Sequence, residues 1–244
     1  MQHILRRKII SILIAFLILP YIGLSQLRDD APNLPDHDNK LYHFGINLGY
    51  NKSYSSFTHH PYYLQQDSVR GIESINSSGL SLGWMVNLNL DDHFDLRTYP
   101  VNLTFSETAF QYTLLYPDIP AGESTLTTQK IQSITMSWPI QLKFSSDRIY
   151  NYKVYTFAGV KFAYDFSANA GKTNAGEIIQ LKPFDYGIQG GIGFHFYYPY
   201  FVLTPEINFS WGLANLHSRN PSLKFSSSID KINSRMITFS LMVE

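Results

Sequence analysis

The chain has 244 residues, with 19 basic and 19 acidic side chains, no cysteine, and a charged fraction of only 16%. Soluble proteins are about a quarter charged, so this low charge and the 15% of aromatic residues are unusual for one. The lack of cysteine excludes a disulfide framework, thiol chemistry and a lipoprotein anchor. The even balance of charge gives no basic surface for nucleic acid.

The N-terminus has the order of a secretory signal peptide. Three basic residues at positions 6–8 precede an apolar run of 11 residues, Ile9–Leu19, and small residues follow. The run is too short to span a membrane as a helix. We therefore expect residues 1–25 to be a signal peptide that is removed from the mature chain. Without its three basic residues the chain has 16 basic and 19 acidic side chains, a net charge of −3.

A polar, acidic segment that contains proline follows at residues 26–40. From Leu27 to Lys40 it reads "LRDDAPNLPDHDNK" and has no apolar periodicity. Such a composition predicts an extended arm that is not part of a core. We expect the folded domain to occupy residues 41–244.

Eight segments of that domain alternate apolar and polar residues, which is the pattern of a β-strand with two different faces. The alternation is clearest between Phe184 and Gly212, where residues 197–200 ("YYPY") predict a turn between two strands. The apolar faces run, in chain order, from Tyr42 to Tyr50, Leu80 to Leu90, Phe94 to Tyr116, Ile134 to Phe144, Tyr152 to Phe166, Phe184 to Phe196, Phe201 to Trp211 and Ile237 to Val243.

The connections between these segments alternate between long and short. The long ones are polar and occupy Phe57–Ser78, Pro117–Thr128, Ser167–Gln180 and Ala214–Ser228. Alternating short turns and long loops are typical of outer-membrane barrels. A soluble sandwich would instead cover the apolar faces with a second sheet, and a lipocalin would turn them inward.

Two further features favour lipid as the environment of the apolar faces. The opposite faces are rich in Gly, Ser, Asn and charge, which suits a narrow polar lumen. Aromatic residues gather at strand ends, as in interfacial girdles; they are Tyr42, Tyr150, Tyr152, Tyr197, Tyr198, Tyr200 and Phe201. We predict an all-β, eight-stranded antiparallel transmembrane β-barrel of the cell outer membrane, with short periplasmic turns, long external loops and both termini periplasmic.

The third strand is irregular, because its parity shifts near Pro100 and again near Glu107. We interpret both shifts as β-bulges. Pro100, Pro139 and Pro205 all fall inside strand patterns, although a closed barrel has no free edge to absorb a missing donor. We therefore expect bulges or strand ends at these prolines.

Seven charged residues lie on the polar faces, and we interpret them as a structural network in the lumen. An eight-stranded barrel is filled by side chains, and buried charge must be paired. The alternative is a proton or ligand site, for which Lys161 and Asp185 on neighbouring strands are candidates. The seven are Arg97, Lys143, Lys153, Lys161, Asp165, Asp185 and Glu206.

The sequence predicts no catalytic, cofactor or metal site. His195 faces the lumen beside a turn, but no serine motif supplies a nucleophile. His59 and His60 are adjacent and lack the spacing of metal ligands. We expect a non-enzymatic protein without a small-molecule substrate, and a lipid-modifying outer-membrane enzyme is the weaker alternative.

Five segments, in order along the chain, resemble the PorT (SprT) family of outer-membrane barrels, which belong to the type IX secretion system of Bacteroidota. They are "NLPDHDNKLYHFGINLGYN" (33–51), "HFDLR" (93–97), "KFSSDRIYNYKVYTFAG" (143–159), "YYPYFVLTPEINFSWGLANL" (197–216) and "SIDKINSRMITFSL" (228–241).

The resemblance implies a component that exports proteins with C-terminal signals across the outer membrane and that affects gliding motility in some species. It implies other type IX secretion proteins and membrane lipid as partners, and it assigns no catalytic positions. A surface adhesion or structural barrel is the alternative function.

Overall fold

The computed structural model describes residues 32–61, 69–116, 124–168, 179–218 and 229–244. The expected signal peptide and residues 26–31 of the expected arm lie outside these ranges. The chain divides into two compact units, Met1–Asn33 and Leu34–Glu244, and the second unit is considered below. No helix among the described residues is long and apolar enough to cross a membrane.

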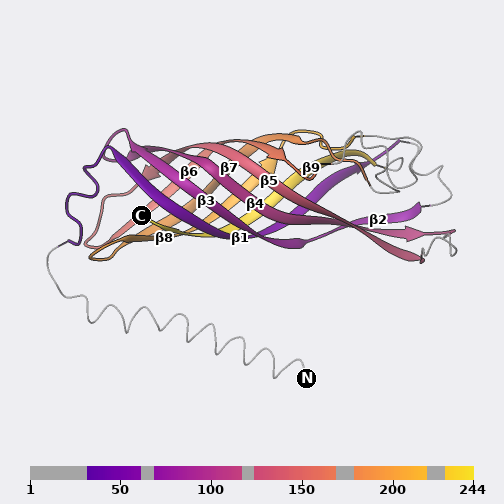
Figure 1. The fold of residues 1–244 in the computed structure, drawn as a ribbon, viewed down its shortest axis with the longest axis horizontal. Coiled ribbons are helices and arrows are strands. Elements are labelled where there is room, and N and C mark those ends of the chain that lie inside the picture. Colours follow the sequence, from indigo (N-terminus) through magenta and orange to yellow (C-terminus); the bar gives the residue numbers. More distant parts are fainter. Residues whose placement is uncertain (1–31, 62–68, 117–123, 169–178, 219–228) are drawn as a thin grey trace, which may run out of the picture. The chain divides into compact units, whose positions relative to one another are not determined.

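Residues Leu34–Glu244 contain a single antiparallel sheet that closes on itself (Figure 1). Its described strands are β1 (Tyr42–His59), β2 (Val69–Ile75), β3 (Ser77–Asn89), β4 (Phe94–Leu114), β5 (Leu126–Ser145), β6 (Tyr152–Asp165), β7 (Phe184–Tyr197), β8 (Val202–Gly212) and β9 (Ile229–Val243). Pairing of β4 with both β3 and β5 completes the ring β4-β3-β1-β9-β8-β7-β6-β5. Because β2 and β3 both pair with β4 and only Asn76 separates them, they are two parts of one interrupted strand. The described ring therefore has the eight strands that the sequence predicts.

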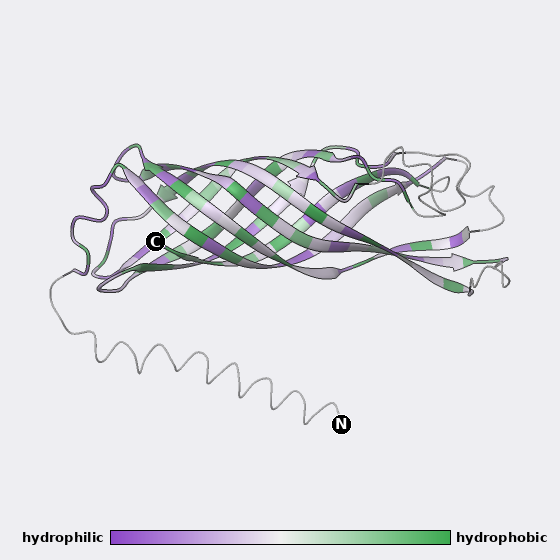
Figure 2. Cartoon of the chain, in the orientation of Figure 1, coloured by the Kyte–Doolittle hydropathy of each residue, from purple (hydrophilic) through white to green (hydrophobic). Residues whose placement is uncertain are grey.

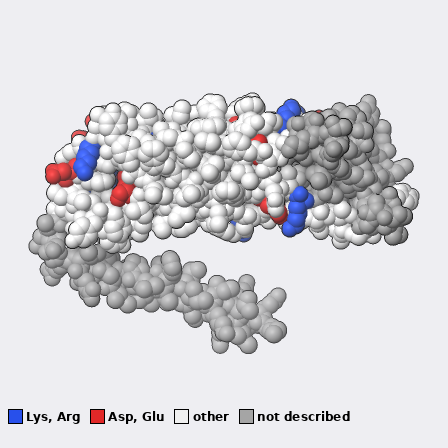
Figure 3. Space-filling model, in the orientation of Figure 1, with Lys and Arg blue, Asp and Glu red and all other residues white. Residues whose placement is uncertain are grey.

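The apolar faces of the strands point outward. Leu80 and Ile188 are 63% and 48% exposed, whereas their polar neighbours Ser81 and Gln189 are 6% and 5% exposed. Figure 2 shows the alternation of hydrophobic and hydrophilic residues along the strands. On the face seen in Figure 3, a band without charged residues separates two groups of charged ones. A closed barrel with an apolar outer belt and a polar interior is typical of outer-membrane proteins, as predicted, and is the reverse of a lipocalin.

The two ends of the barrel differ in their connections (Figure 1). Residues 90–93, 146–151 and 198–201 are short connections and define what we call the short-turn end. The strand ends that the longer connections join lie at the opposite end, which we call the loop end. The C-terminus lies at the short-turn end, where Glu244 and Val202 exchange two backbone hydrogen bonds.

Several strands extend further toward the loop end than the sequence predicts. β1 continues to His59, and β2 lies inside the segment 57–78 that the alternation assigns to a loop. β1 remains paired with β9 as far as His59 and Ile229. The apolar pattern ends earlier because residues 52–56 ("KSYSS") are mostly polar on both faces of the strand. The pairing of β1 with β9 therefore extends further along the chain than the alternation of apolar and polar residues does.

The three prolines are accommodated in different ways. Pro100 lies in a β-bulge, as predicted, since β4 has one residue more than β3 between successive pairs. Pro139 faces the same irregularity from β5, and Thr98 Oγ1 donates a hydrogen bond to its carbonyl at 2.8 Å. Pro205 lies beside an interruption in the β7–β8 pairing. The expectation of a bulge is thus confirmed for Pro139, which lies opposite the irregular part of β4. It is wrong for Pro205, where the β7–β8 pairing is interrupted without a register shift inside β8.

The second parity shift, near Glu107, is not a bulge of β4 itself, because the extra residue there lies on the β2–β3 side, where residues 76–79 face residues 106–108. β4 and β5 pair without a register shift from Leu103 to Thr113. The inward side of β4 changes its chemistry instead: it carries hydroxyl side chains as far as Thr108 and apolar ones from Phe110 onward. The same side of the strand thus passes from a polar lumen to an apolar core.

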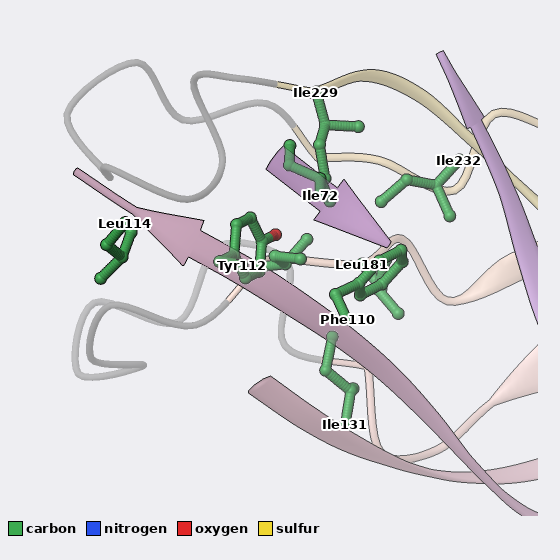
Figure 4. Close-up of a cluster of buried hydrophobic side chains, with 9 residues drawn as sticks. Ile72, Phe110, Tyr112, Leu114, Ile131, Leu181, Ile229 and Ile232 are labelled. Carbon is green, nitrogen blue, oxygen red and sulfur yellow. The ribbon is translucent and has the colours of Figure 1, made fainter. Parts of the chain in front are cut away.

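That core is a group of buried apolar side chains at the loop end (Figure 4), which we call the loop-end cluster. It draws on β2, β4, β5, β9 and the segment before β7, and Phe57 and Leu216 pack against it. Its members are Ile72, Phe110, Tyr112, Leu114, Ile131, Ile179, Leu181, Ile229 and Ile232. This part of the molecule is built like a small soluble core, with its apolar side chains inside.

Candidate functional site

The middle of the lumen is occupied by an ion pair between Arg97 on β4 and Glu206 on β8. Arg97 Nη2 lies 2.5 Å from Glu206 Oε2, and the two side chains are only 1% and 2% exposed. Tyr155 Oη donates to the same carboxylate at 2.7 Å, and Arg97 Nε donates to Gln141 Oε1 at 2.6 Å. Each charge is therefore paired and hydrogen-bonded, which is the condition for burying it.

Aromatic rings surround the guanidinium of this pair. Its carbon lies 4.8 Å from the ring centre of Phe157, 5.5 Å from that of Tyr155 and 5.7 Å from that of Tyr99. Tyr155 and Phe157 on β6 lie directly opposite Gly193 and Gly191 on β7. A Cβ at Gly193 would lie 2.3 Å from Tyr155 Oη, so the glycine makes room for the ring.

The sequence analysis missed Tyr155 and Phe157 as lumen residues. Both fall on the polar side of their strand, where the pattern predicts small or charged side chains. Glycines at alternate positions of the adjacent strand are the signal that could have revealed them, because an aromatic ring often covers a strand glycine.

A second group lies between this pair and the short-turn end. Lys143 Nζ is 2.8 Å from Asp95 Oδ2, its direct cross-strand neighbour, and 3.3 Å from His195 Nε2. An ammonium group only donates, so Nε2 accepts and Nδ1 carries the proton that it donates to Thr204 Oγ1 at 2.8 Å. His195 is therefore fixed inside the barrel, away from the lipid-facing wall.

The segment Leu34–Lys40 folds onto the short-turn end of the barrel. Asp38 Oδ1 accepts a hydrogen bond from Tyr197 Oη at 2.7 Å and lies 3.6 Å from Lys153 Nζ, while Oδ2 lies 3.2 Å from Arg148 Nη1. Burial raises the pKa of Asp38, but the bond from Tyr197 and the two cations outweigh it, and the net pKa is below the usual range. For these residues the prediction of an extended arm is wrong, because Asp38 forms ion pairs with Arg148 and Lys153 of the barrel.

The same contacts correct the predicted girdle at one position. Tyr197 is only 5% exposed and points into the lumen, so it does not belong to an interfacial belt. Tyr42, Tyr150, Tyr198, Tyr200 and Phe201 are exposed, as expected for girdle residues.

A polar cavity of about 130 Å³ lies on the loop side of the Arg97–Glu206 pair. Lys161, Asp165 and Asp185 line it. Asp185 Oδ2 accepts a hydrogen bond from Ser234 Oγ at 2.5 Å, and Asp165 Oδ2 accepts one from Ser133 Oγ at 2.7 Å.

The seven charged residues predicted for the lumen thus fall into separate groups along its axis. Arg97 and Glu206 pair directly. Lys143 and Lys153 pair with acidic residues outside the predicted set, Asp95 and Asp38. The remaining three, Lys161, Asp165 and Asp185, line the loop-side cavity. Asp38 was missed because it precedes the first strand, and Asp95 because the irregular β4 obscures its face.

A small cavity of about 20 Å³ lies at the short-turn end. The imidazoles of His37 and His43 and the carboxylate of Glu244 line it, with ligand atoms that all lie within 4.8 Å of one another. Burial and the neighbouring His43 lower the pKa of His37 to about 4. Burial raises the pKa of the Glu244 carboxyl, although Lys143 and Arg97 oppose it. The sequence gives no spacing signal for this group, because its members come from the arm, the first strand and the end of the chain.

Comparison with known proteins yields one family and several similar folds. The model of the outer membrane protein beta-barrel domain matches residues 25–218. Neisserial surface protein A has 12% sequence identity and a TM-score of 0.43, covering 84% of this chain and 99% of its own. OprG from Pseudomonas aeruginosa has 11% identity and a TM-score of 0.42, covering 82% and 92%. Ail, the attachment invasion locus protein of Yersinia pestis, has 11% identity and a TM-score of 0.38, covering 82% and 96%.

None of the curated protein sequences matches the chain. The family model, by contrast, spans strands β1 to β8 of the barrel and more than half of the chain. Its description agrees with a closed sheet that exposes its apolar face and buries a polar one. The chain belongs to the outer membrane protein beta-barrel domain family.

Proposed function

We propose that this protein is a non-enzymatic component of type IX protein secretion that acts through its surfaces and not through its lumen. The observation that carries the proposal is the filled interior of the barrel. Arg97 and Tyr155 separate a cavity of about 130 Å³ on the loop side from one of about 20 Å³ at the short-turn end. The described part of the lumen therefore offers no path for a polypeptide, and a cargo would need another subunit to cross the membrane.

The secretion role is supported by the ordered resemblance of five segments to the PorT family. Two of these segments supply the contacts at the short-turn end: Asp38 comes from the first, and Arg148 and Lys153 come from the third. Part of the sequence that resembles the family thus lies where the barrel presents a folded polar surface. We place this end in the periplasm, because outer-membrane barrels have their short turns there.

Two surfaces are available for partners under this proposal. The folded segment Leu34–Lys40 and the short turns would face periplasmic components of the secretion system. The apolar wall, with Leu48 and Leu80 more than 60% exposed, would contact lipid or the wall of a larger translocon. His195, the residue considered for the weaker alternative of a lipid-modifying enzyme, lies in the lumen and faces neither surface.

The test is deletion of the gene in its native host, with measurement of the secreted fraction of a type IX cargo. We expect cargo to accumulate in the periplasm and a plasmid copy to restore export. A plasmid copy that lacks residues 34–40 should restore the barrel in the membrane without restoring export. Unchanged export in the deletion strain would overturn the proposal.

A second candidate function is adhesion at the cell surface, and the length of two strands favours it. β4 and β5 have 21 and 20 residues, whereas about 9–11 residues suffice to cross the bilayer. Their excess length extends the paired β4 and β5 toward the loop end, where they would present a binding surface. If this candidate is right, the deletion strain exports its cargo normally and loses attachment to a surface or a host cell.

A further inference from the structure

The small cavity at the short-turn end has the composition of a metal site. His37 and His43 offer imidazole nitrogens, and Glu244 offers a carboxylate oxygen, all within 4.8 Å of one another. Two imidazoles and one carboxylate form a donor set that zinc uses in proteins, with a fourth position left for water. Imidazole also selects zinc and its transition-metal neighbours over magnesium and calcium, which prefer oxygen ligands.

The three side chains are held in place before any ion arrives. The backbone of Glu244 exchanges two hydrogen bonds of 3.0 Å with Val202, and its side chain lies over Gly45, where a Cβ would approach Glu244 Cγ to 3.0 Å. His37 lies in a turn closed by the bond from its own amide to the carbonyl of Leu34 at 3.1 Å. Its ring packs 4.2 Å from that of His43, measured between centroids.

The distances suit an ion after a small movement of side chains. His43 Nδ1 lies 3.9 Å from a Glu244 oxygen. Ligand atoms bound to zinc at about 2.0–2.1 Å are separated by roughly 3.4 Å in a tetrahedral site. Each ligand atom therefore has to move toward the centre by less than about 1 Å, which side-chain rotation provides without displacing a strand.

A second observation in the same cavity points to a bound species. Asn87 lies directly across the β1–β3 ladder from His43 and is 3% exposed. Asn87 lines the cavity, and its Oδ1 is buried and has no hydrogen-bond partner among the described residues. An oxygen that only accepts is the natural partner of a water molecule bound to a metal ion, because such a water donates both of its protons.

The charge of the cavity also suits a cation. Three carboxylates line it, those of Asp38, Asp95 and Glu244, against the two ammonium groups of Lys143 and Lys153. With neutral imidazoles the lining carries a net charge of −1. The volume of about 20 Å³ is close to what a single water or ion occupies, since about 10–15 Å³ is needed for one water molecule.

We propose that His37, His43 and Glu244 bind one divalent transition-metal ion of the zinc class. The ion would fasten the arm to the seam where the barrel closes. Hydrogen bonding between the first and last strands ends at the pair Ile46 and Val243. His43 and Glu244 lie just beyond this last pair. A shared ion would therefore link β1 and β9 past the end of their hydrogen bonding and hold His37 of the arm against both strands. This proposal is independent of the secretion role.

The experiment measures zinc binding to the mature chain in detergent, after metal has been removed with a chelator that is then dialysed away. Isothermal titration with Zn²⁺ alone should give one ion per chain. His37→Gln, His43→Gln and Glu244→Gln should each lower the affinity by about a hundredfold, because even losing an outer hydrogen-bond partner of a metal ligand costs about 10–100-fold. The matched control is His93→Gln, since His93 also lies at the short-turn end but outside the cavity.

Two further measurements keep the outcome decisive. Heat-dependent migration on a gel reports whether each variant still forms a closed barrel, and His37→Gln changes only the arm. Cobalt(II) in place of zinc should give the visible absorption of a tetrahedral site in the wild-type chain and not in His37→Gln. Absence of zinc binding to the wild-type chain, or binding that survives in folded His37→Gln and His43→Gln, would overturn the proposal.

Discussion

The middle of the barrel and its loop end use opposite arrangements of the same strands. Around the middle, β4 and β5 turn polar side chains inward and apolar ones outward, whereas at the loop end Phe110 and Ile131 point inward. The pairing of β4 with β5 has no register shift at the change between Thr108 and Phe110. The two regions therefore differ in the solvent outside the wall: lipid imposes an apolar exterior, and water restores the ordinary preference for an apolar core.

The two regions should also lose stability for different reasons when an inward-facing side chain is replaced. The middle is held by paired charges, for which removal of one partner leaves the other exposed to a low-dielectric interior. The loop end is held by apolar packing, for which removal of a side chain leaves a cavity. Each of the following substitutions tests one side of this comparison.

The largest effect is expected in the middle, at the buried ion pair. Glu206→Gln leaves the guanidinium of Arg97 without its carboxylate, and we expect a loss of about 3–5 kcal/mol in the free energy of unfolding. The measurement is reversible denaturant unfolding of the barrel in lipid vesicles, followed by tryptophan fluorescence.

The matched control is the exposed pair of Lys130 and Glu107, whose side chains are 64% and 30% exposed. Lys130→Gln should change the unfolding free energy by no more than about 1 kcal/mol. The double variant Arg97→Met with Glu206→Gln should be more stable than Glu206→Gln alone, because it removes the uncompensated charge. Equal stability of these two variants would mean that the pair is not the element that holds the middle.

At the loop end the sensitive element is the apolar cluster. Phe110→Ala removes a fully buried ring, and we expect a loss of about 3 kcal/mol, at the low end of the range for buried aromatic residues because loops border the site. Hydrogen exchange should show faster opening of β2 and of the outer part of β4 while the middle stays protected. Leu126→Ala, at an exposed position of β5 in the same region, is the control and should change little. Faster exchange throughout the barrel would show that the two regions are not separate.

The sequence predicts the lipid-embedded strands well for a physical reason. Lipid on one side and a polar lumen on the other force residues such as Ile188 and Gln189 into strict alternation. Outside the lipid this requirement for alternation does not apply. The alternation therefore does not predict the polar outer part of β1 or any part of β2. Backbone pairing continues there without leaving a pattern in the side chains.

The interior contacts are less predictable because they join distant parts of the chain. The sequence places Arg97 and Glu206 on inward faces, but their pairing depends on strand register and on the height of each residue in the barrel. His37 and Asp38 gave no signal at all, since an acidic segment next to proline is typical of an extended linker. Only the fold brings these residues beside cations and carboxylates from other strands.

A third prediction compares the exteriors of the two regions with one type of substitution. Ile188→Arg places a charge on the lipid-facing side of the middle of β7, where we expect a loss of about 2–4 kcal/mol. Leu126→Arg places the same charge on the outer face of β5 at the loop end, and there we expect a change within about 0.5 kcal/mol. The unfolding free energy of both variants in lipid vesicles provides the test. Equal losses at the two positions would place the loop end within the lipid and contradict the comparison.

The smallest effect is expected at the short-turn end, where a charged contact holds the arm on the barrel. Asp38→Asn removes the charge that Arg148 and Lys153 neutralise, and we expect the docked arm to lose about 1–2 kcal/mol. Because the chain has no cysteine, Asp36→Cys provides a single site for a spin label at an exposed position of the arm. The mobility of that label reports docking directly, and it should increase at neutral pH in the Asp38→Asn variant.

The pH dependence gives this last prediction a definite sign. The pKa of Asp38 is lower in the folded protein than its ordinary value of 3.8. The contact therefore contributes fully above the ordinary pKa and is lost as the pH falls through the lowered one. The label should stay immobile from neutral pH down through the ordinary titration range of an aspartate, and it should become mobile only in stronger acid. In Asp38→Asn the same acid range should produce no transition, because the group that binds the proton is gone; a transition that persists there would assign the docking to another residue.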